Sequence, residues 1–399
     1  MHILQNPIAK NFGHTALMEA SQEGHVSVVD ALLKSGADVN IASNVGYTAL
    51  IAASQGDHWS VVDSLLQSGA DVNMATIYGS TALMEASQEG HMSVVDSLLQ
   101  SGSDVNMATI YGSTALILAT REGRGSVVDA LLQSGADVNS ANNHGNTALT
   151  VASQEGHVSI VDALLQSGAD VNITSNDGDT ALIAASKMCY GLIVNSLLQS
   201  GADVNMADNY GTTALMAVGY NDEDGSAVVD ALLQSGADVN MADNKGNTAL
   251  YIACSNGQDL VVVNSLLQSG ADVHIASNNG STALMMASAN SEGGSVVDAL
   301  LQSGAAVNNT DNAGNTALYI ASKYGNDLIV NSLLQSGADV NITNNAGNTA
   351  FYIASKYGHN LVVNLLLQSG ADVNIASNDG STALHIAGKN HDVAYSPLH

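Results

Sequence analysis

Histidines are the side chains of this sequence most able to hold a metal ion, and their placement argues against that role. His25, His91, His157 and His359 each follow a glycine and lie far apart along the chain. No cysteine or histidine falls at the short spacing that a zinc site requires. We therefore expect these histidines to stabilise turns, and we expect no metal site.

Cys189 and the acidic run at residues 222–224 are the other candidates for chemistry. Cys189 lies near Lys187 and Tyr190, but no base with an orienting group accompanies it, so a structural thiol is the better reading. The acidic run could attract a cation weakly, yet it lacks the oxygen-ligand pattern of a calcium loop. The glycines form no phosphate-binding loop. The sequence thus predicts no catalytic residue and no cofactor.

All of these residues are carried by one repeating unit. Successive repeats are 33 to 35 residues long, and a glycine stands two residues before every Thr-Ala-Leu or Thr-Ala-Phe motif. A period of this length is typical of a solenoid. We expect one array over residues 1–399, with eleven complete repeats over 13–380 and a truncated or frayed repeat over 381–399. Because neither end resembles a polar capping repeat, we expect a piece of a longer array or frayed ends.

The repeat at residues 46–78 predicts the local structure. Gly46 permits a tight turn, and Thr48 can cap a short helix that begins with small apolar residues. A second helix follows with one apolar stripe over residues 61–66, and Gly69 ends it. We predict an all-α solenoid, a curved superhelix of helix-turn-helix repeats joined by β-turn or hairpin loops. The insertions at 220–225 and 289–294 are expected to project as loops between helices.

The repeat resembles the ankyrin repeat. The motifs that carry the resemblance are Thr-Ala-Leu-x-x-Ala, Gly-His, Val-Val-x-x-Leu-Leu at 28–33 and Gly-Ala-Asp-Val-Asn at 36–40. They recur in register over nearly the whole chain. Alanine replaces the usual proline at the first helical position, and the histidine that follows survives only as His385, so we expect individual repeats to be less stable. The resemblance also leaves open hydroxylation of asparagines such as Asn40.

Composition limits the partners. The formal net charge is −28 with only nine basic residues, so charge alone disfavours nucleic acid and anionic membranes as ligands. No apolar run is long enough to span a bilayer, and the first residues do not resemble a secretory signal. The two cysteines suit a reducing compartment. We expect a monomeric array located in the cytoplasm or the nucleus.

The resemblance implies that a partner protein binds the turn tips and the exposed ends of the first helices. The candidate residues are Phe12, Val45, Tyr47, Ile77, Tyr78, Ile110, Tyr111 and Tyr210 at the tips, and Lys323, Tyr324, Lys356 and Tyr357 at helix ends. Two alternatives stay open: the tip side chains pack against each other, and duplication alone explains the Lys-Tyr pairs.

The predicted function is a non-catalytic scaffold or adaptor that binds a protein on the concave face and turn tips. The alternative is the regulatory ankyrin portion of a larger enzyme, of a ubiquitin-ligase or phosphatase complex, or of a channel. In that case the catalytic or membrane part lies outside this chain.

Overall fold

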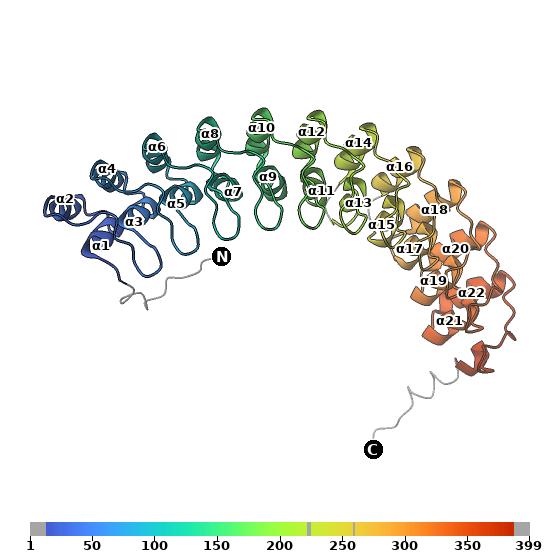
Figure 1. Ribbon diagram of the computed structural model, residues 1–399. Coiled ribbons are helices and arrows are strands. Elements are labelled where there is room, and N and C mark those ends of the chain that lie inside the picture. Colours follow the sequence, from blue (N-terminus) through green and yellow to red (C-terminus); the bar gives the residue numbers. More distant parts are fainter. Residues whose placement is uncertain (1–12, 222–224, 258–259, 387–399) are drawn as a thin grey trace, which may run out of the picture. The chain divides into compact units, whose positions relative to one another are not determined.

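The computed structural model describes residues 13–221, 225–257 and 260–386 (Figure 1). Over these residues the chain forms pairs of short helices joined by tight turns, and the described part contains isolated bridges in place of extended strands. The prediction of an all-α solenoid is confirmed.

Each repeat contributes a first and a second helix. The first helices are α1 (Ala16–Gln22), α3 (Ala49–Gln55), α5 (Ala82–Glu89), α7 (Ala115–Arg121), α9 (Ala148–Glu155), α11 (Ala181–Lys187), α13 (Ala214–Val218), α15 (Ala249–Ser255), α17 (Ala283–Ala289), α19 (Ala317–Tyr324) and α21 (Ala350–Tyr357). The second helices are α2 (Val26–Lys34), α4 (Trp59–Gln67), α6 (Met92–Gln100), α8 (Gly125–Gln133), α10 (Val158–Gln166), α12 (Gly191–Gln199), α14 (Ser226–Gln234), α16 (Leu260–Gln268), α18 (Gly294–Gln302), α20 (Asp327–Gln335) and α22 (Asn360–Gln368).

The threonine of each motif stands immediately before a first helix. The Thr48 hydroxyl accepts a hydrogen bond from the backbone N–H of Ile51 at 3.2 Å, which satisfies a donor that the helix itself leaves free. Helices of this length are not stable alone, so burial must hold them. In the following helix Val61, Val62 and Leu65 are fully buried. The predicted apolar stripe is thus the side that packs into the core.

The loops between repeats form turn tips that lie close to each other. Gly79 has φ +78°, a conformation that strongly favours glycine. A Cβ atom at Gly79 would also lie 2.9 Å from Cα of Thr109 in the next tip. Both the backbone angle and the close approach therefore require glycine at this position of the repeat.

Contacts divide the chain into two compact units. The N-terminal unit contains the described residues up to Ala185 together with Leu192–Asp203, and the C-terminal unit contains Ser186–Gly191 and the described residues from Val204 onward. In the N-terminal unit α1, α3, α5, α7 and α9 pack in succession, and in the C-terminal unit α13, α15, α17, α19 and α21 do the same. The second helices stack likewise within each unit. The single continuous array stays a prediction.

Small hydroxyl residues are buried at the same position of the first helices in each unit. The hydroxyls of Ser21, Ser54, Ser87, Thr120, Ser153, Ser186 and Ser322 have no hydrogen-bond partner. By contrast, Ser288 donates to the carbonyl of Leu284 at 2.7 Å. Each unpaired hydroxyl loses its bonds to water without compensation, so these positions weaken the core.

Two predicted irregular segments can be located only in part. Residues 290–293 form the expected loop between α17 and α18. Residues 222–224 of the other insertion lie outside the described residues, and so do residues 387–399, on which the prediction of a frayed terminal repeat mostly rests.

Candidate functional site

Neighbouring turn tips are joined by backbone hydrogen bonds. The N–H of Ile77 donates to the carbonyl of Val45 at 2.9 Å, and the N–H of Ile110 donates to the carbonyl of Tyr78 at 2.9 Å. The same bond recurs along the described tips of both units, for example from Asn345 to Ala313 at 2.9 Å. The tips of each unit therefore form a continuous, backbone-linked surface.

Asparagine side chains add a second set of bonds between tips. Their Nδ2 atoms donate to a carbonyl of the preceding tip at 2.8–3.0 Å in Asn143, Asn176, Asn244, Asn278, Asn312, Asn345 and Asn378. We call this set the asparagine ladder. Ile77 and Ile110 occupy the corresponding positions of two consecutive repeats, and an isoleucine side chain cannot donate this bond.

These two isoleucines and the tyrosines after them project into solvent. The exposed fractions are 58% for Ile77, 53% for Tyr78, 54% for Ile110 and 63% for Tyr111. We call these four residues the Ile-Tyr tips. Large apolar side chains exposed together are typical of interaction sites, and tyrosine is among the residues that dominate binding energy.

The other predicted tip residues of the N-terminal unit are less exposed. Val45 and Tyr47 are half-buried. The Tyr47 hydroxyl donates to Oε1 of Gln55 at 2.6 Å, and its ring stacks on His14 with a centroid distance of 6.0 Å. Tyr47 therefore supports the tip from within its own unit. Phe12 lies outside the described residues.

Carboxylates lie beside this part of the N-terminal unit. Glu85 is half-buried at the start of α5, and burial raises the pKa of its carboxyl, with a further upward contribution from Glu89 and an opposing one from a hydrogen bond with Ser80. Burial and the charge of Glu85 also raise the pKa of Tyr47. A ligand that covers Tyr47 and Glu85 would therefore meet negative charge as well as apolar surface.

The Lys-Tyr pairs occupy the ends of α19 and α21. Nζ of Lys323 lies 5.3 Å from the ring centroid of Tyr324, and Nζ of Lys356 lies 5.9 Å from that of Tyr357. These distances suit cation–π pairs. The tyrosines are 54% and 51% exposed. Each pair thus presents a cation and an aromatic face to solvent as one surface.

Tyr210 is a tip residue of the C-terminal unit and is 68% exposed. It follows Asn209, so it lacks the isoleucine neighbour of the Ile-Tyr tips. Its backbone N–H donates to the carboxylate of Asp208 at 2.9 Å. That the twelve sequence-predicted residues bind a partner stays a prediction.

The histidines have a structural role between repeats. Nε2 of His91, His157 and His359 lies 3.1–3.3 Å from a carbonyl at the end of the preceding first helix, and His58 does the same at 3.0 Å. Arg124 and Asn326 make the equivalent bond with their own N–H groups at 3.1 Å. Since different residue types fill the position, it needs only a hydrogen-bond donor. The described residues contain no cluster of three metal-ligating side chains.

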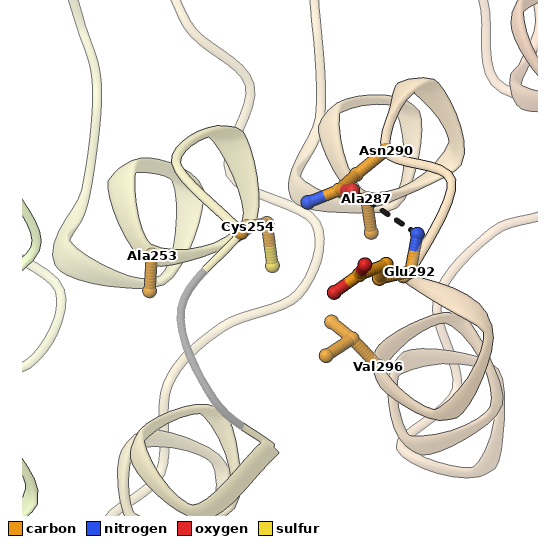
Figure 2. A pocket seen from close by; sticks show the side chains of 8 residues that line it. Ala253, Cys254, Ala287, Asn290, Glu292 and Val296 are labelled. Atoms are coloured by element: carbon orange, nitrogen blue, oxygen red, sulfur yellow. Dashed lines mark hydrogen bonds between the residues drawn. The ribbon is translucent and has the colours of Figure 1, made fainter. Parts of the chain in front are cut away.

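The two cysteines differ in their surroundings. Cys254 is buried, and burial raises the pKa of its thiol to about 12, so the thiol stays protonated and unreactive near neutral pH. Figure 2 shows Cys254, Asn290 and Glu292 around a small pocket of the C-terminal unit. Its volume of about 30 Å³ admits water and little else. Cys189 is half-buried and has φ +53° in the turn before α12, where most repeats have glycine.

The comparisons agree with this architecture. A family model of ankyrin repeats in three copies matches residues 2–76, 50–142, 83–175, 135–208, 182–276, 259–344 and 326–395. The chain therefore belongs to the ankyrin repeat family.

Among solved structures, the chain is similar to the human ASB11 ankyrin repeat domain, with 25% identity and a TM-score of 0.51. The match covers 56% of this chain and 99% of that one. No match to this sequence was found among curated proteins. Ankyrin repeats are in general modules for interaction between proteins. Among the described residues no helix is long and apolar enough to cross a membrane.

Proposed function

We propose that this chain is a non-catalytic scaffold or adaptor that binds a partner protein through the Ile-Tyr tips. The observation that carries the proposal is the replacement of the ladder asparagine by Ile77 and Ile110. In two consecutive repeats an exposed apolar side chain replaces the polar one that elsewhere donates a hydrogen bond to the preceding tip. The fold gains no hydrogen bond from this replacement, whereas a bound partner would bury the side chains.

The same surface indicates the character of the partner. Burying an isoleucine or tyrosine that is now half exposed removes apolar surface from water, which favours association. Glu85 lies close enough to Tyr47 to raise the pKa of its hydroxyl, so a ligand that extends from the Ile-Tyr tips onto Tyr47 would meet this carboxylate. We propose a partner segment with aliphatic or aromatic side chains flanked by lysine or arginine.

The experiment is selection of ligands from a displayed peptide library on the full chain, followed by measurement of affinity for a variant with Tyr78→Ser and Tyr111→Ser. We expect selected ligands to bind the variant at least about tenfold more weakly, since truncated hot spots each cost more than about 1 kcal/mol. His144→Ser is the matched control, because His144 occupies the position of Tyr111 one repeat later and is also exposed. Undiminished affinity in a folded double variant would remove the Ile-Tyr tips as the binding surface.

A further inference from the structure

The edge of the array where the two helices of a repeat meet changes its chemistry along the chain. In early repeats the first helix ends in polar or acidic residues, and the second helix carries serine at its second position and aspartate at its fifth. The third repeat, for example, has Gln88, Glu89, Ser93 and Asp96. At the same positions the last complete repeat has Lys356, Tyr357, Leu361 and Asn364.

The preceding repeat shows the same inversion. It has Lys323, Tyr324, Leu328 and Asn331 at these four positions. Helix α19 packs on α21, and α20 packs on α22, so the two altered repeats are adjacent in the C-terminal unit (Figure 1). We call the surface formed by Lys323, Tyr324, Leu328, Lys356, Tyr357 and Leu361 the Lys-Tyr-Leu edge.

Packing does not account for the change. Leu328 is 77% exposed and Leu361 is 67% exposed, so neither leucine contributes much to the core. Glu89 and Ser93 are exposed at the equivalent positions of the N-terminal unit. The backbone therefore accepts serine and leucine equally at this site. Duplication accounts for two similar copies, but it gives no reason for three exposed apolar or basic replacements in each copy.

Charge changes together with hydrophobicity. The four positions carry a formal charge of −2 in the third repeat, from Glu89 and Asp96, and +1 in the last, from Lys356. Asp327 retains one carboxylate beside Leu328, and Asn360 stands at its place in the last repeat. In a chain with a net charge of −28, these positions are positive here and in the sixth repeat, which has Lys187, Met188, Leu192 and Asn195.

We propose that the Lys-Tyr-Leu edge docks an acidic segment of a partner protein that carries regularly spaced apolar side chains; this rests on the proposed function as a protein-binding array. Carboxylates of the segment pair with Lys323 and Lys356, which already lie over Tyr324 and Tyr357. Its apolar side chains cover the tyrosine rings and the two leucines. The edge thus differs from the Ile-Tyr tips, which contain no lysine or arginine.

The stacking of repeats sets the spacing of the apolar contacts. Packed helices lie about 8–10 Å apart, and a polyproline II helix rises about 3.1 Å per residue with three residues per turn. Equivalent points on the two repeats are therefore about three residues apart along a polyproline II segment, on one face of it. The edge fits an acidic segment with an apolar residue at every third position.

The probe is a fluorescent synthetic peptide of aspartate and leucine, with leucine at every third position, titrated into the full chain and followed by anisotropy. The edge variant takes its residues from the N-terminal repeats: Lys323→Gln, Tyr324→Glu, Leu328→Ser, Lys356→Gln, Tyr357→Glu and Leu361→Ser. We expect binding to the native chain, at least about tenfold weaker binding to the edge variant, and weakening by added salt. Circular dichroism checks that the variant is folded.

A transplant provides the matched control for the edge variant. The substitutions Arg121→Lys, Glu122→Tyr, Ser126→Leu, Gln154→Lys, Glu155→Tyr and Ser159→Leu place a second edge on two adjacent repeats of the N-terminal unit. We expect this variant to bind two peptides per chain. If the edge variant loses binding only because it is damaged, the transplant still reports whether these residue types suffice.

Several results would overturn the proposal. The first three are that the peptide does not bind, that the edge variant binds it as well as the native chain does, or that a control peptide with serine in place of leucine binds equally well. The other two are that the chain binds phosphatidylserine vesicles more strongly than the peptide, or that the chain dimerises through this edge. The Tyr78→Ser and Tyr111→Ser variant should bind the acidic peptide normally. If the edge does not bind the acidic peptide while library ligands still bind the tips, only this inference fails. If library ligands do not bind the tips while the edge binds the acidic peptide, only the proposed binding at the tips fails.

Discussion

Exchanging the isoleucines of the Ile-Tyr tips for asparagine should leave the fold almost unchanged. In a variant with Ile77→Asn and Ile110→Asn, each new amide can donate to the preceding tip as Asn143 does to the carbonyl of Ile110 at 2.9 Å. Such a bond contributes about 0.5–1.5 kcal/mol. Ile77 is 58% exposed and Ile110 is 54% exposed, so replacing either isoleucine removes less than half of the roughly 1.5–3 kcal/mol that a fully buried isoleucine contributes to stability. The two effects nearly cancel, so we expect a change within about 1 kcal/mol per site.

Urea unfolding followed by far-UV circular dichroism measures this change in stability. Because long repeat arrays can unfold in parts, hydrogen exchange in α3, α5 and α7 measures the change locally as well. Ile51→Ala calibrates the scale, because Ile51 is fully buried and its truncation should cost about 2–5 kcal/mol. A loss of more than about 2 kcal/mol per site in the double variant would refute the reasoning. Such a loss would mean that Ile77 and Ile110 stabilise the fold itself, so that their presence at the tips would not indicate a binding partner.

Substitutions at three further positions test individual interactions by urea unfolding. Replacing His91 by alanine should destabilise the array by about 1 kcal/mol, because the bond to the carbonyl of Gln55 is lost. His91→Asn should recover part of this stability, since Asn326 makes the equivalent bond with an amide. An equal loss of stability in both variants would contradict this role of His91. Ser54→Ala should raise stability by about 1 kcal/mol, because the buried Ser54 hydroxyl is unpaired, and a loss would show that it is bonded. Glu85→Gln should stabilise the protein at neutral pH and have little effect below about pH 4. The carboxyl pKa of Glu85 is raised in the folded state, so the stability of the native protein falls as pH rises from the unfolded pKa through the folded pKa. A benefit independent of pH would exclude a titrating Glu85.

The local structure of each repeat could be predicted because short-range chemistry determines it. A glycine such as Gly46 with positive φ and a capping threonine such as Thr48 act within a few residues of themselves. Their roles follow from residue type and spacing, and the structure confirms both. The structural role of His91, His157 and His359 also followed from their place between two helices, although their partner carbonyls did not.

The asparagine ladder was missed because its bonds join residues about one repeat apart. Only the stacking of tips brings Asn143 to the carbonyl of Ile110. The signal was present in the sequence, since Asn44, Ile77, Ile110 and Asn143 follow one another at intervals of 33 residues. Comparing the repeats position by position would have shown where isoleucine replaces asparagine.

Exposure was the second quantity that sequence reasoning could not supply. Tyr47 was grouped with the tip aromatics, yet its ring stacks on His14 and its hydroxyl bonds Gln55. Leu328 and Leu361 stand where the repeat at residues 46–78 has Ser60, outside its predicted apolar stripe, and they were not among the predicted binding residues. Which side chains of a short helix face solvent depends on the packing of the neighbouring repeats, and the position within a single repeat does not reveal it.

The most direct test of the account is the affinity of library-selected ligands for the variant with Ile77→Asn and Ile110→Asn. This variant keeps the tip backbone bonds and can complete the asparagine ladder, so it isolates the exposed apolar side chains from the fold. We predict that the variant is as stable as the native chain and binds the ligands at least about tenfold more weakly. Unchanged affinity in the stable variant would contradict the claim that the Ile-Tyr tips exist to hold a partner protein.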